Sequence, residues 1–456
     1  MDAFRETLDI EFSSFTANTN IIFVIDHAGR AGNGFFQTIF DQHPQVIACP
    51  WMHYVYSYII TACGEHDQLD AHLVWETWRE SRYFSLLYHD LDDGGRRFVR
   101  KFGGDPDSSL DRSVIRATFD ALLLGKTHIS RKDLIAAMFF SYARGLGRDT
   151  GKIRYILSPD SISLRFESAM SGFSGKVVDF VIHDFPSARL IHLERDPRAG
   201  FASTNHQFVN QLGNMYGLKP GQFWRRLLRL LRCDFDWDSV FVFGFLLIYF
   251  RQTFRVVMRK RSEYPEKFIT VLNEDLNLSF VPTMQKLAKT LDIDWLPAWT
   301  NDFRPTMLGR EWTGTGAYNS QYQTSVHGPL KNDPDHVARS VSGPNAYVTQ
   351  RWRSRLKKNE IFIVERLLAA ELRHFDYEFV YSADRLRSHR ELLLNLWAPL
   401  NGEMPSLLWL SAGARLGGKE LFGRLFYTMT FPVFYISARL VFLGLIKRGR
   451  MFSNDL

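Results

Sequence analysis

The segment Ile21–Pro44 constrains the fold more than any other part of the chain, because it joins a strand pattern, a glycine-rich turn and a helix start. The β-branched and aromatic run Ile21–Ile25 predicts a buried parallel strand. In the turn Gly29–Gly34, the glycines allow the backbone to approach a ligand closely. From Phe35 the pattern predicts a helix, whose first N–H groups have no intrahelical partner. Together these elements predict an anion-binding turn, and the alternative is a glycine turn that binds nothing.

The residue types in this turn indicate which chemistry it supports. Arg30 carries a planar guanidinium that suits the oxygens of phosphate or sulfate. The Walker A motif of nucleoside triphosphatases needs a Lys followed by a Ser or Thr that holds magnesium. Residues Gly29–Phe36 contain neither, so the sequence disfavours an enzyme that transfers phosphoryl groups from ATP.

Strand and helix patterns alternate along the rest of the chain. Further strands are predicted at Lys152–Leu157, Arg189–Glu194 and Phe268–Leu272. Helices are predicted over residues 65–150 and at Phe35–Asp41, Ala199–Val209, Val281–Leu291 and Asn359–Phe375. This alternation predicts an α/β fold with a central parallel sheet flanked by helices. Residues 300–350 predict a long functional loop region.

Composition limits the classes of partner and the compartment. With 45% hydrophobic and 14% aromatic residues in 456, the chain can bury a large core and is not disordered throughout. A net charge of +7 suits an anionic ligand or an anionic membrane surface. Nucleic acid would also fit this charge, but the basic residues are not gathered into one long run. Cys49, Cys63 and Cys233 form no CxxC pair, so neither a zinc site nor a disulfide framework is predicted. This cysteine usage leads us to expect a reducing, cytoplasmic location, and the N-terminus shows no signal-peptide pattern.

A second motif follows the predicted strand Arg189–Glu194. Arg195, in the sequence Arg195-Asp196-Pro197, stands at the carboxyl end of that strand, where open α/β sheets bind their ligands. Ser203 stands on the helix that follows and offers a hydroxyl to the same anion. The alternative is a surface arginine paired with Asp196 and an incidental serine.

These two motifs, in this order, resemble those of the superfamily of sulfotransferases that use 3′-phosphoadenosine-5′-phosphosulfate (PAPS), of the carbohydrate or bacterial type. The turn GRAGNG is similar to the family's 5′-phosphosulfate loop, and RDPRAGFAS is similar to its 3′-phosphate motif. Three further stretches are similar to family segments: VLNEDLNLSFVPTMQKLAKTLDI, FRPTMLGREWTGTGAYNS and RWRSRLKKNEIFIVERLLAAELRHFDYE. The resemblance covers about residues 20–380. It implies a P-loop NTPase-like sulfotransferase fold with a helical C-terminal extension.

The resemblance also implies roles for single residues. The 5′-phosphosulfate would be held by Gly29, Arg30, Ala31, Gly32, Asn33, Gly34 and Phe35. Arg195 and Ser203 would hold the 3′-phosphate, and Arg351 would close the nucleotide site. Asn33 and Gly34 stand where relatives carry two hydroxyl residues, and Gly34 offers its backbone N–H alone.

The family moves a sulfuryl group from PAPS to an acceptor without a metal, and leaves the product 3′-phosphoadenosine 5′-phosphate (PAP). Arg30 would stabilise the charge that develops on the leaving phosphate. A general base must take the acceptor proton. His53 is the base candidate in Gln45–Tyr54, which has no carboxylate, and His27 before the turn is the competing one. His128, Asp160 and His206 are further candidates, His206 more as a structural or acceptor-facing residue.

The resulting hypothesis is a sulfotransferase, spanning residues 1–400, that acts on a hydroxyl of a carbohydrate, polysaccharide or lipid-linked acceptor. The alternative is a degenerate nucleotide-fold protein that serves as a membrane-associated binding module. Residues 401–456 form an apolar and basic tail, in which Leu421–Leu445 is interrupted by Arg424, Pro432 and Arg439. We interpret this stretch as an interfacial helix pair, peripheral on the inner face of a membrane, or alternatively as a helix packed on the domain. Val240–Phe250 is too short to span a bilayer. The acceptor, the oligomeric state and the identity of the base do not follow from the sequence.

Overall fold

The fold is described from a computed structural model of the chain. The structure describes residues 2–26, 30–49, 52, 54–81, 84–101, 105–108, 110–160, 175–212, 250–312, 324–325, 328–329, 343–405, 407–415 and 417–447. Gly29, His27 and His53 therefore lie outside the described residues, as do all but Phe250 of Val240–Phe250 and most of residues 313–342.

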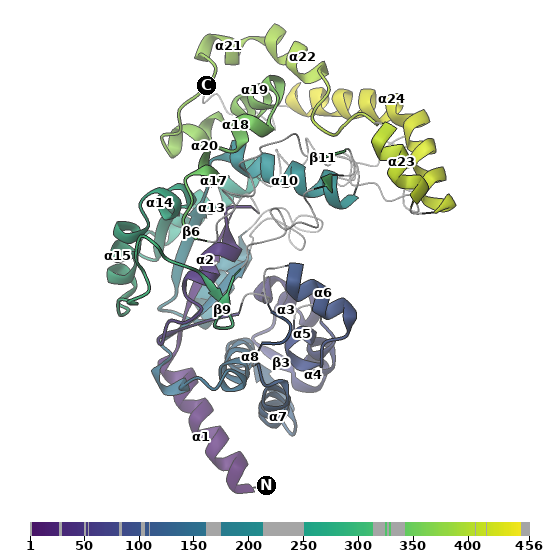
Figure 1. The fold of residues 1–456 in the computed structure, drawn as a ribbon. Helices are drawn as coiled ribbons and strands as arrows, with labels where there is room; N and C mark the ends of the chain where they lie inside the picture. Colours follow the sequence, from purple (N-terminus) through teal and green to yellow (C-terminus); the bar gives the residue numbers. More distant parts are fainter. Residues whose placement is uncertain are drawn as a thin grey trace.

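A sheet of five parallel strands lies at the centre of the molecule, in the order β2-β5-β1-β6-β7 (Figure 1). The strands are β1 Asn20–Ile25, β2 Val46–Ala48, β5 Tyr155–Asp160, β6 Arg189–Glu194 and β7 Phe268–Leu272. Every residue of Ile21–Ile25 is fully buried, because β1 is the middle strand and both faces of the sheet are covered. The predicted α/β class, with a central parallel sheet flanked by helices, is confirmed.

Two predicted strands have the observed bounds, and the others differ for local reasons. β6 and β7 begin and end where the sequence predicts. β5 begins three residues after the predicted start, because Thr150–Lys152 forms a 3₁₀ turn (η1). β2 was not predicted, since a strand of three residues after His43-Pro44 is too short to show a pattern.

Helices build the rest of the described molecule. In the first half of the chain they are α1 Asp2–Asn18, α2 Asn33–Ile39, α3 Val55–Cys63, α4 Ala71–Arg79, α5 Ser85–Tyr88, α6 Asp93–Lys101, α7 Arg112–Leu123, α8 Arg131–Gly145, α9 Lys176–Asp184 and α10 Pro197–Leu212. In the second half they are α13 Thr253–Glu263, α14 Asn273–Leu278, α15 Phe280–Leu291, α17 Tyr347–Gln350, α18 Trp352–Arg355, α19 Lys358–Leu367, α20 Ala369–His374, α21 Ala383–Arg387, α22 His389–Trp397, α23 Leu407–Arg415 and α24 Gly418–Lys447. Short antiparallel pairs are β3 Gln68–Asp70 with β4 His128–Ser130, β8 Thr306–Met307 with β9 Arg310–Glu311, and β10 Thr324–Ser325 with β11 Gly328–Pro329.

The chain reverses its direction of travel across the sheet at β1. From β1 it passes through α2 to β2 on one side, and β5 then pairs between those two strands. It next crosses to the other side of β1, where β6 and β7 complete the sheet. In open α/β sheets ligands bind outside the carboxyl ends of the strands at such a switch point. The topology therefore directs attention to the ends of β1 and β6.

Two large hydrophobic clusters hold the described residues together. The first surrounds the sheet and reaches α1 and the helices α3–α8 at the lower end of Figure 1. The second lies at the opposite end and joins α10, α18 and α19 to α22, α23 and α24. The proposed boundary near residue 400 stays a prediction, and the second cluster contains residues from both sides of it.

The C-terminal extension is helical, as predicted, but the predicted helix pair at Leu421–Leu445 is wrong. A single helix, α24, runs through Pro432. Phe431 and Phe434, on either side of Pro432, are both buried in the second cluster, so packing on both sides holds the helix together despite the missing N–H. Among the described residues, one helix is long and apolar enough to cross a membrane, at Leu421–Gly444.

Candidate functional site

The turn after β1 requires a glycine at position 32. Gly32 is the residue before α2 and has φ of 107°, in the left-handed region that side chains rarely adopt. A Cβ atom at this position would lie 2.3 Å from Nδ2 of Asn273, at the start of α14. The turn is therefore packed directly against the carboxyl end of β7, which fixes its path beside the switch point.

Arg30 and Arg195 meet at the carboxyl ends of β1 and β6. The guanidinium of Arg195 donates to the backbone oxygen of Arg30, at 3.2 Å, and to that of Val348, at 2.9 Å. Nε of Arg30 donates to the hydroxyl of Ser203 on α10, at 3.2 Å. The structure thus brings together residues that the sequence assigns to two separate phosphate groups, with Arg30 between them.

Two further arginines extend this group. Burial lowers the pKa of Arg351 well below its usual range, and the nearby charges of Arg195, Arg355 and Arg30 lower it further. Burial, followed by the charge of Arg195, lowers the pKa of Arg30 to about 10. We call Arg30, Arg195, Arg351 and Arg355 the arginine cluster. Because buried like charges repel one another, a multiply charged anion bound among them would be stabilised strongly.

The alternative in which Arg195 pairs with Asp196 at the surface is wrong. Arg195 is 4% exposed, and the partner of Asp196 is Arg198, which donates from Nη2 at 2.8 Å. Arg198 also donates to Glu365 on α19, at 2.6 Å, and lies over the ring of Trp352. These contacts fix the first turn of α10 to α18 and α19. Arg195 is therefore released from ion pairing with its neighbour, and its Nε atom is buried without a hydrogen-bond partner among the described residues.

The remaining described residues of the turn are Ala31 and Asn33 to Phe35. Ala31 is buried, and the ring of Phe35 stacks on Trp312 with centroids 6.2 Å apart. The amide of Asn33 donates to Asp26, at 2.6 Å, so its donor group faces the end of β1. Gly34 offers its N–H at the start of α2. Because α2 has only seven residues, the arginine cluster is the main source of positive charge at this edge of the sheet.

Several candidate bases have other roles or lie outside the described residues. His53, His27 and the side chain of His206 lie outside the described residues. Asp160, at the end of β5, accepts hydrogen bonds from the backbone and hydroxyl of Ser57, at 3.1 and 2.9 Å, and so caps α3. His128 is exposed on β4 and contacts the hydroxyl of Thr127.

Sequence reasoning missed Tyr54 as a neighbour of the turn. Tyr54 precedes α3 with φ of 61°, a strained value for a residue other than glycine. Its phenol lies close enough to Arg30 to act on the pKa of the guanidinium. A left-handed tyrosine leaves no signal in the sequence, because its backbone is held by tertiary contacts such as the bond from its N–H to the oxygen of Pro159.

Two asparagines on α14 connect the turn to the segment that carries Arg351. Asn277 donates to the backbone oxygen of Asn273, at 2.7 Å, and accepts from the N–H of Asn345, at 3.0 Å. Asn273 is the residue packed against Gly32. The asparagines stand in the family-like stretch VLNEDLNLSF, which was the available signal, but their connecting role was not predicted.

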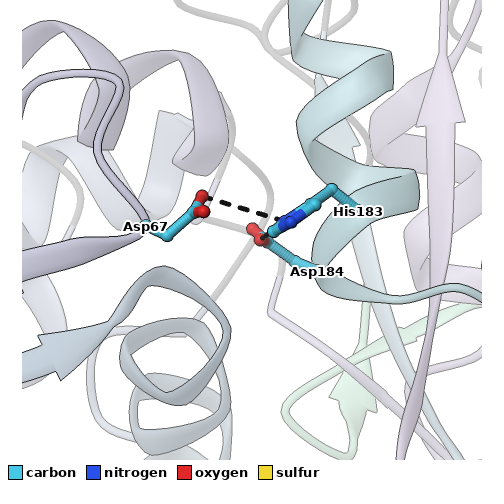
Figure 2. A group of neighbouring side chains, drawn as sticks. All are labelled: Asp67, His183 and Asp184. Atoms are coloured by element: carbon cyan, nitrogen blue, oxygen red, sulfur yellow. Dashed lines mark hydrogen bonds and ion pairs between the residues drawn. The ribbon is translucent and has the colours of Figure 1, made fainter.

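A separate group of potential metal ligands lies away from the arginine cluster, between β3 and the end of α9. Asp67, His183 and Asp184 point toward one another, and their ligand atoms lie within 4.8 Å (Figure 2). Arg131, which is fully buried, donates to Asp184 from Nε, at 2.7 Å, and to Asp67 from Nη2, at 3.1 Å. A cation is thus already bound to both carboxylates, and the group is an ion-pair network that joins α8 to α9.

Comparisons with known proteins give weak structural likenesses. No family model matches the chain, and no curated protein matches it. The sulfotransferase domain from the Synechococcus PCC 7002 olefin synthase is 14% identical, with a TM-score of 0.37, over 79% of this chain and 96% of that one. The sulfotransferase domain from the curacin biosynthetic pathway is 13% identical, with a TM-score of 0.38, over 79% and 99%. A sulfotransferase from Mycobacterium avium is 12% identical, with a TM-score of 0.31, over 79% and 78%. Because TM-scores below 0.5 do not establish a common fold, the function of this chain has to be inferred from its own residues.

Proposed function

We propose that this protein is a PAPS-dependent sulfotransferase that transfers a sulfuryl group to a hydroxyl of a carbohydrate, polysaccharide or lipid-linked acceptor. The observation that carries the proposal is the arginine cluster at the switch point of the sheet. Arg30 and Arg195 come from the turns after neighbouring strands, and Arg351 comes from a distant segment. Folding thus gathers buried positive charge at the place where α/β sheets bind nucleotides.

The residues present fit a nucleotide with anionic groups at both ends. Arg195 and Ser203 would hold the 3′-phosphate, and the buried Nε of Arg195, which has no hydrogen-bond partner among the described residues, is a donor suited to it. The backbone of the turn from Ala31 to Phe35 would hold the 5′-phosphosulfate. Arg30 belongs to both groups, because its backbone lies in the turn and its side chain reaches Ser203.

When bound, PAPS supplies an activated sulfuryl group and a phosphate leaving group. The arginine cluster would bind both anionic ends and favour the charge that develops on the leaving oxygen. Arg351 would close over the nucleotide from the α17–α18 segment. A base must remove the proton of the acceptor hydroxyl, and we propose His53 for this role with His27 as the competing candidate.

The test uses the full chain, PAP and a matched set of variants. We expect PAP to bind the wild-type protein in calorimetry, and Arg195→Ala and Arg351→Met to weaken binding more than about tenfold, because each removes charge-assisted hydrogen bonds. Arg259→Ala is the control, since Arg259 is half exposed on α13 and pairs with Glu263. Circular dichroism shows whether each variant is folded. A wild-type protein that does not bind PAP would contradict the proposal.

Activity distinguishes an enzyme from a degenerate binding module. Transfer of labelled sulfuryl from PAPS to a panel of hydroxyl acceptors, lost in Arg195→Ala, supports the enzyme. The position of Asn33, whose amide donates to Asp26, favours the binding module as the second candidate. PAP binding with no transfer to any acceptor would support that candidate. Magnesium-dependent ATP turnover would contradict both.

A further inference from the structure

The outer face of α24 is apolar from Phe422 to Leu440. Its exposed side chains recur every three or four residues: Phe422, Leu425, Met429, Val433, Ile436 and Leu440. We call these six residues the outer stripe. At 100° per residue they occupy an arc of roughly 80° on one side of the helix. Met429, at its centre, is 80% exposed.

The two arginines between Leu421 and Gly444 point the other way, into the protein. Both side chains of the Arg439–Glu403 ion pair are fully buried, and Arg439 also donates to the backbone oxygen of Leu396. Arg424, on the same inner side, donates to the backbone oxygen of Trp409. The two arginines that argue against a membrane segment in the sequence are thus neutralised or hydrogen-bonded away from the outer stripe.

The hydroxyl groups of two threonines on the helix are also satisfied internally. Thr428 donates to the backbone oxygen of Arg424, and Thr430 donates to that of Phe426, both at 2.8 Å. Every exposed residue from Leu421 to Gly444 is apolar or glycine. The outer stripe therefore presents no hydrogen-bonding side chain that needs water, which is the condition for contact with lipid hydrocarbon.

We propose that the outer stripe of α24 inserts into the surface of an anionic lipid bilayer, with the helix parallel to the membrane plane. The charge pattern fits this partner at the C-terminal end, because Lys447 ends the helix and Arg448 and Arg450 come next in the sequence, whereas Lys419 near its start is followed by Glu420. Trp397 on α22 is partly exposed beside Tyr435 of α24, with ring centroids 6.3 Å apart. Tryptophan and tyrosine favour the boundary between headgroups and acyl chains.

The packing of α24 favours the parallel orientation over a spanning one. Its inner side contributes Tyr427, Phe434 and Phe442 to the second hydrophobic cluster. A helix that crossed the bilayer would have to leave this cluster and carry the Arg439 guanidinium into hydrocarbon. In the parallel orientation these contacts are kept and the outer stripe alone enters the lipid.

The experiment is flotation of the full chain with vesicles of phosphatidylcholine alone or with phosphatidylglycerol. We expect binding to the anionic vesicles, weaker binding to the neutral ones, and a loss of more than about tenfold in Met429→Glu/Val433→Glu. The control is Ile10→Glu/Leu278→Glu, which alters two side chains exposed by 66% and 58% on α1 and α14. Equal binding of the two double variants would overturn the proposal.

Two further readouts identify other occupants of the outer stripe. A protease site added after Leu456 is cleaved from outside the vesicle if α24 lies in the plane, and protection of that site would show a spanning helix and overturn the proposal. Analytical ultracentrifugation without lipid tests for a second copy of the chain. A dimer that Met429→Glu/Val433→Glu dissociates, with no vesicle binding by the wild-type protein, would assign the outer stripe to self-association instead.

Discussion

At the scale of single residues, the candidate site combines a backbone that accepts one residue type with side chains that are costly to bury. Gly32 is required by both its φ and its contact with Asn273. Burial lowers the pKa of Arg30, Arg195 and Arg351, and the charge of Arg195 lowers the pKa of the other two further. The folded protein therefore holds these guanidinium groups at a free-energy cost. Functional sites commonly carry such costs, which ligand binding offsets.

Replacing Gly32 separates the two reasons for a glycine there. We expect Gly32→Ala to lower the free energy of unfolding by about 2–4 kcal/mol, from left-handed strain together with the clash against Asn273. Gly147→Ala is the matched control, because Gly147 has φ of 67° with nothing within 4 Å of the added Cβ. It should cost about 1 kcal/mol. Urea unfolding measures both, and equal losses would show that the contact with Asn273 contributes nothing.

Glu274 predicts a dependence of stability on pH. Burial raises the pKa of its carboxyl to about 7, against the attraction of Arg195. An unfolded glutamate titrates near about 4.3, so the folded state binds more protons between about pH 4.5 and 7. The free energy of unfolding should therefore fall by about 1–3 kcal/mol as the pH rises through this window and level off above it.

Glu274→Gln tests this assignment. The variant keeps an acceptor for the N–H of Asp196 and a polar partner for Tyr377. Its stability in urea should fall less between pH 4.5 and 7 than that of the wild-type protein. Ionised Glu274 attracts Arg195 and so competes with an anionic ligand. The PAP affinity of the wild-type protein, relative to that of the variant, should therefore weaken as the pH rises through 7. Parallel pH profiles for the two proteins would contradict the prediction.

At the scale of elements, the same kind of side chain has opposite roles in two places. Four arginines at the sheet edge lie close to one another, with the carboxylates of Glu274 and Asp196 attracting Arg195, whereas Arg439 of α24 and Arg198 of α10 are each ion-paired with a buried carboxylate. The like-charge arrangement suits an anionic ligand, and the ion-paired one connects helices. The sequence shows an arginine in each case, and the surrounding charges decide the role.

The Arg439–Glu403 pair predicts how α24 is attached. Removing one partner leaves a buried charge, so we expect Arg439→Met to lower the free energy of unfolding by about 3–5 kcal/mol. The double variant Arg439→Met/Glu403→Leu should recover most of this loss, since apolar side chains of similar volume can replace a buried ion pair. Urea unfolding of the two single variants and the double variant measures the coupling. Additive losses would show that the pair does not interact.

At the scale of the whole molecule, the C-terminal helices are part of the same packed body as the first turn of α10. Ala199, Phe201 and Ala202 lie in one hydrophobic cluster with Trp409 and Phe434. Because α10 also carries Ser203, the position of α24 and that of the arginine cluster are mechanically connected. A membrane that binds the outer stripe would therefore hold the arginine cluster at a defined orientation.

Truncation tests this connection. A chain of residues 1–400 would expose the apolar side of α10, α18 and α19 that α23 and α24 cover. We expect a lower Tm, exposed apolar surface that binds a hydrophobic dye, and weaker PAP binding. The full-length variant Met429→Glu/Val433→Glu is the control, because it alters the outer stripe and leaves the cluster in place. Unchanged stability and PAP binding in residues 1–400 would show that the tail is an independent unit.

Much of the fold follows from local patterns in the sequence. The strand β1 was predictable because a buried parallel strand appears as a continuous apolar run next to turn residues. The strands β6 and β7 were predictable as short runs that end at turn residues. Arg30 and Arg195 were identifiable because each follows such a strand. β2, with three residues, and the left-handed Tyr54 left no local pattern, since tertiary contacts hold them.

By itself, the sequence determined the α/β class, the parallel sheet and the two motifs that contain Arg30 and Arg195. The tertiary structure decided which of those side chains meet, because hydrogen bonds and buried charges join segments that are far apart in the chain. In the folded protein Arg30 donates to Ser203, Asp196 is ion-paired with Arg198, and Arg351 lies at the same edge of the sheet. The tertiary structure also turned the arginines of α24 inward, since burial beside Glu403 and backbone oxygens satisfies them, and so left an apolar face outside.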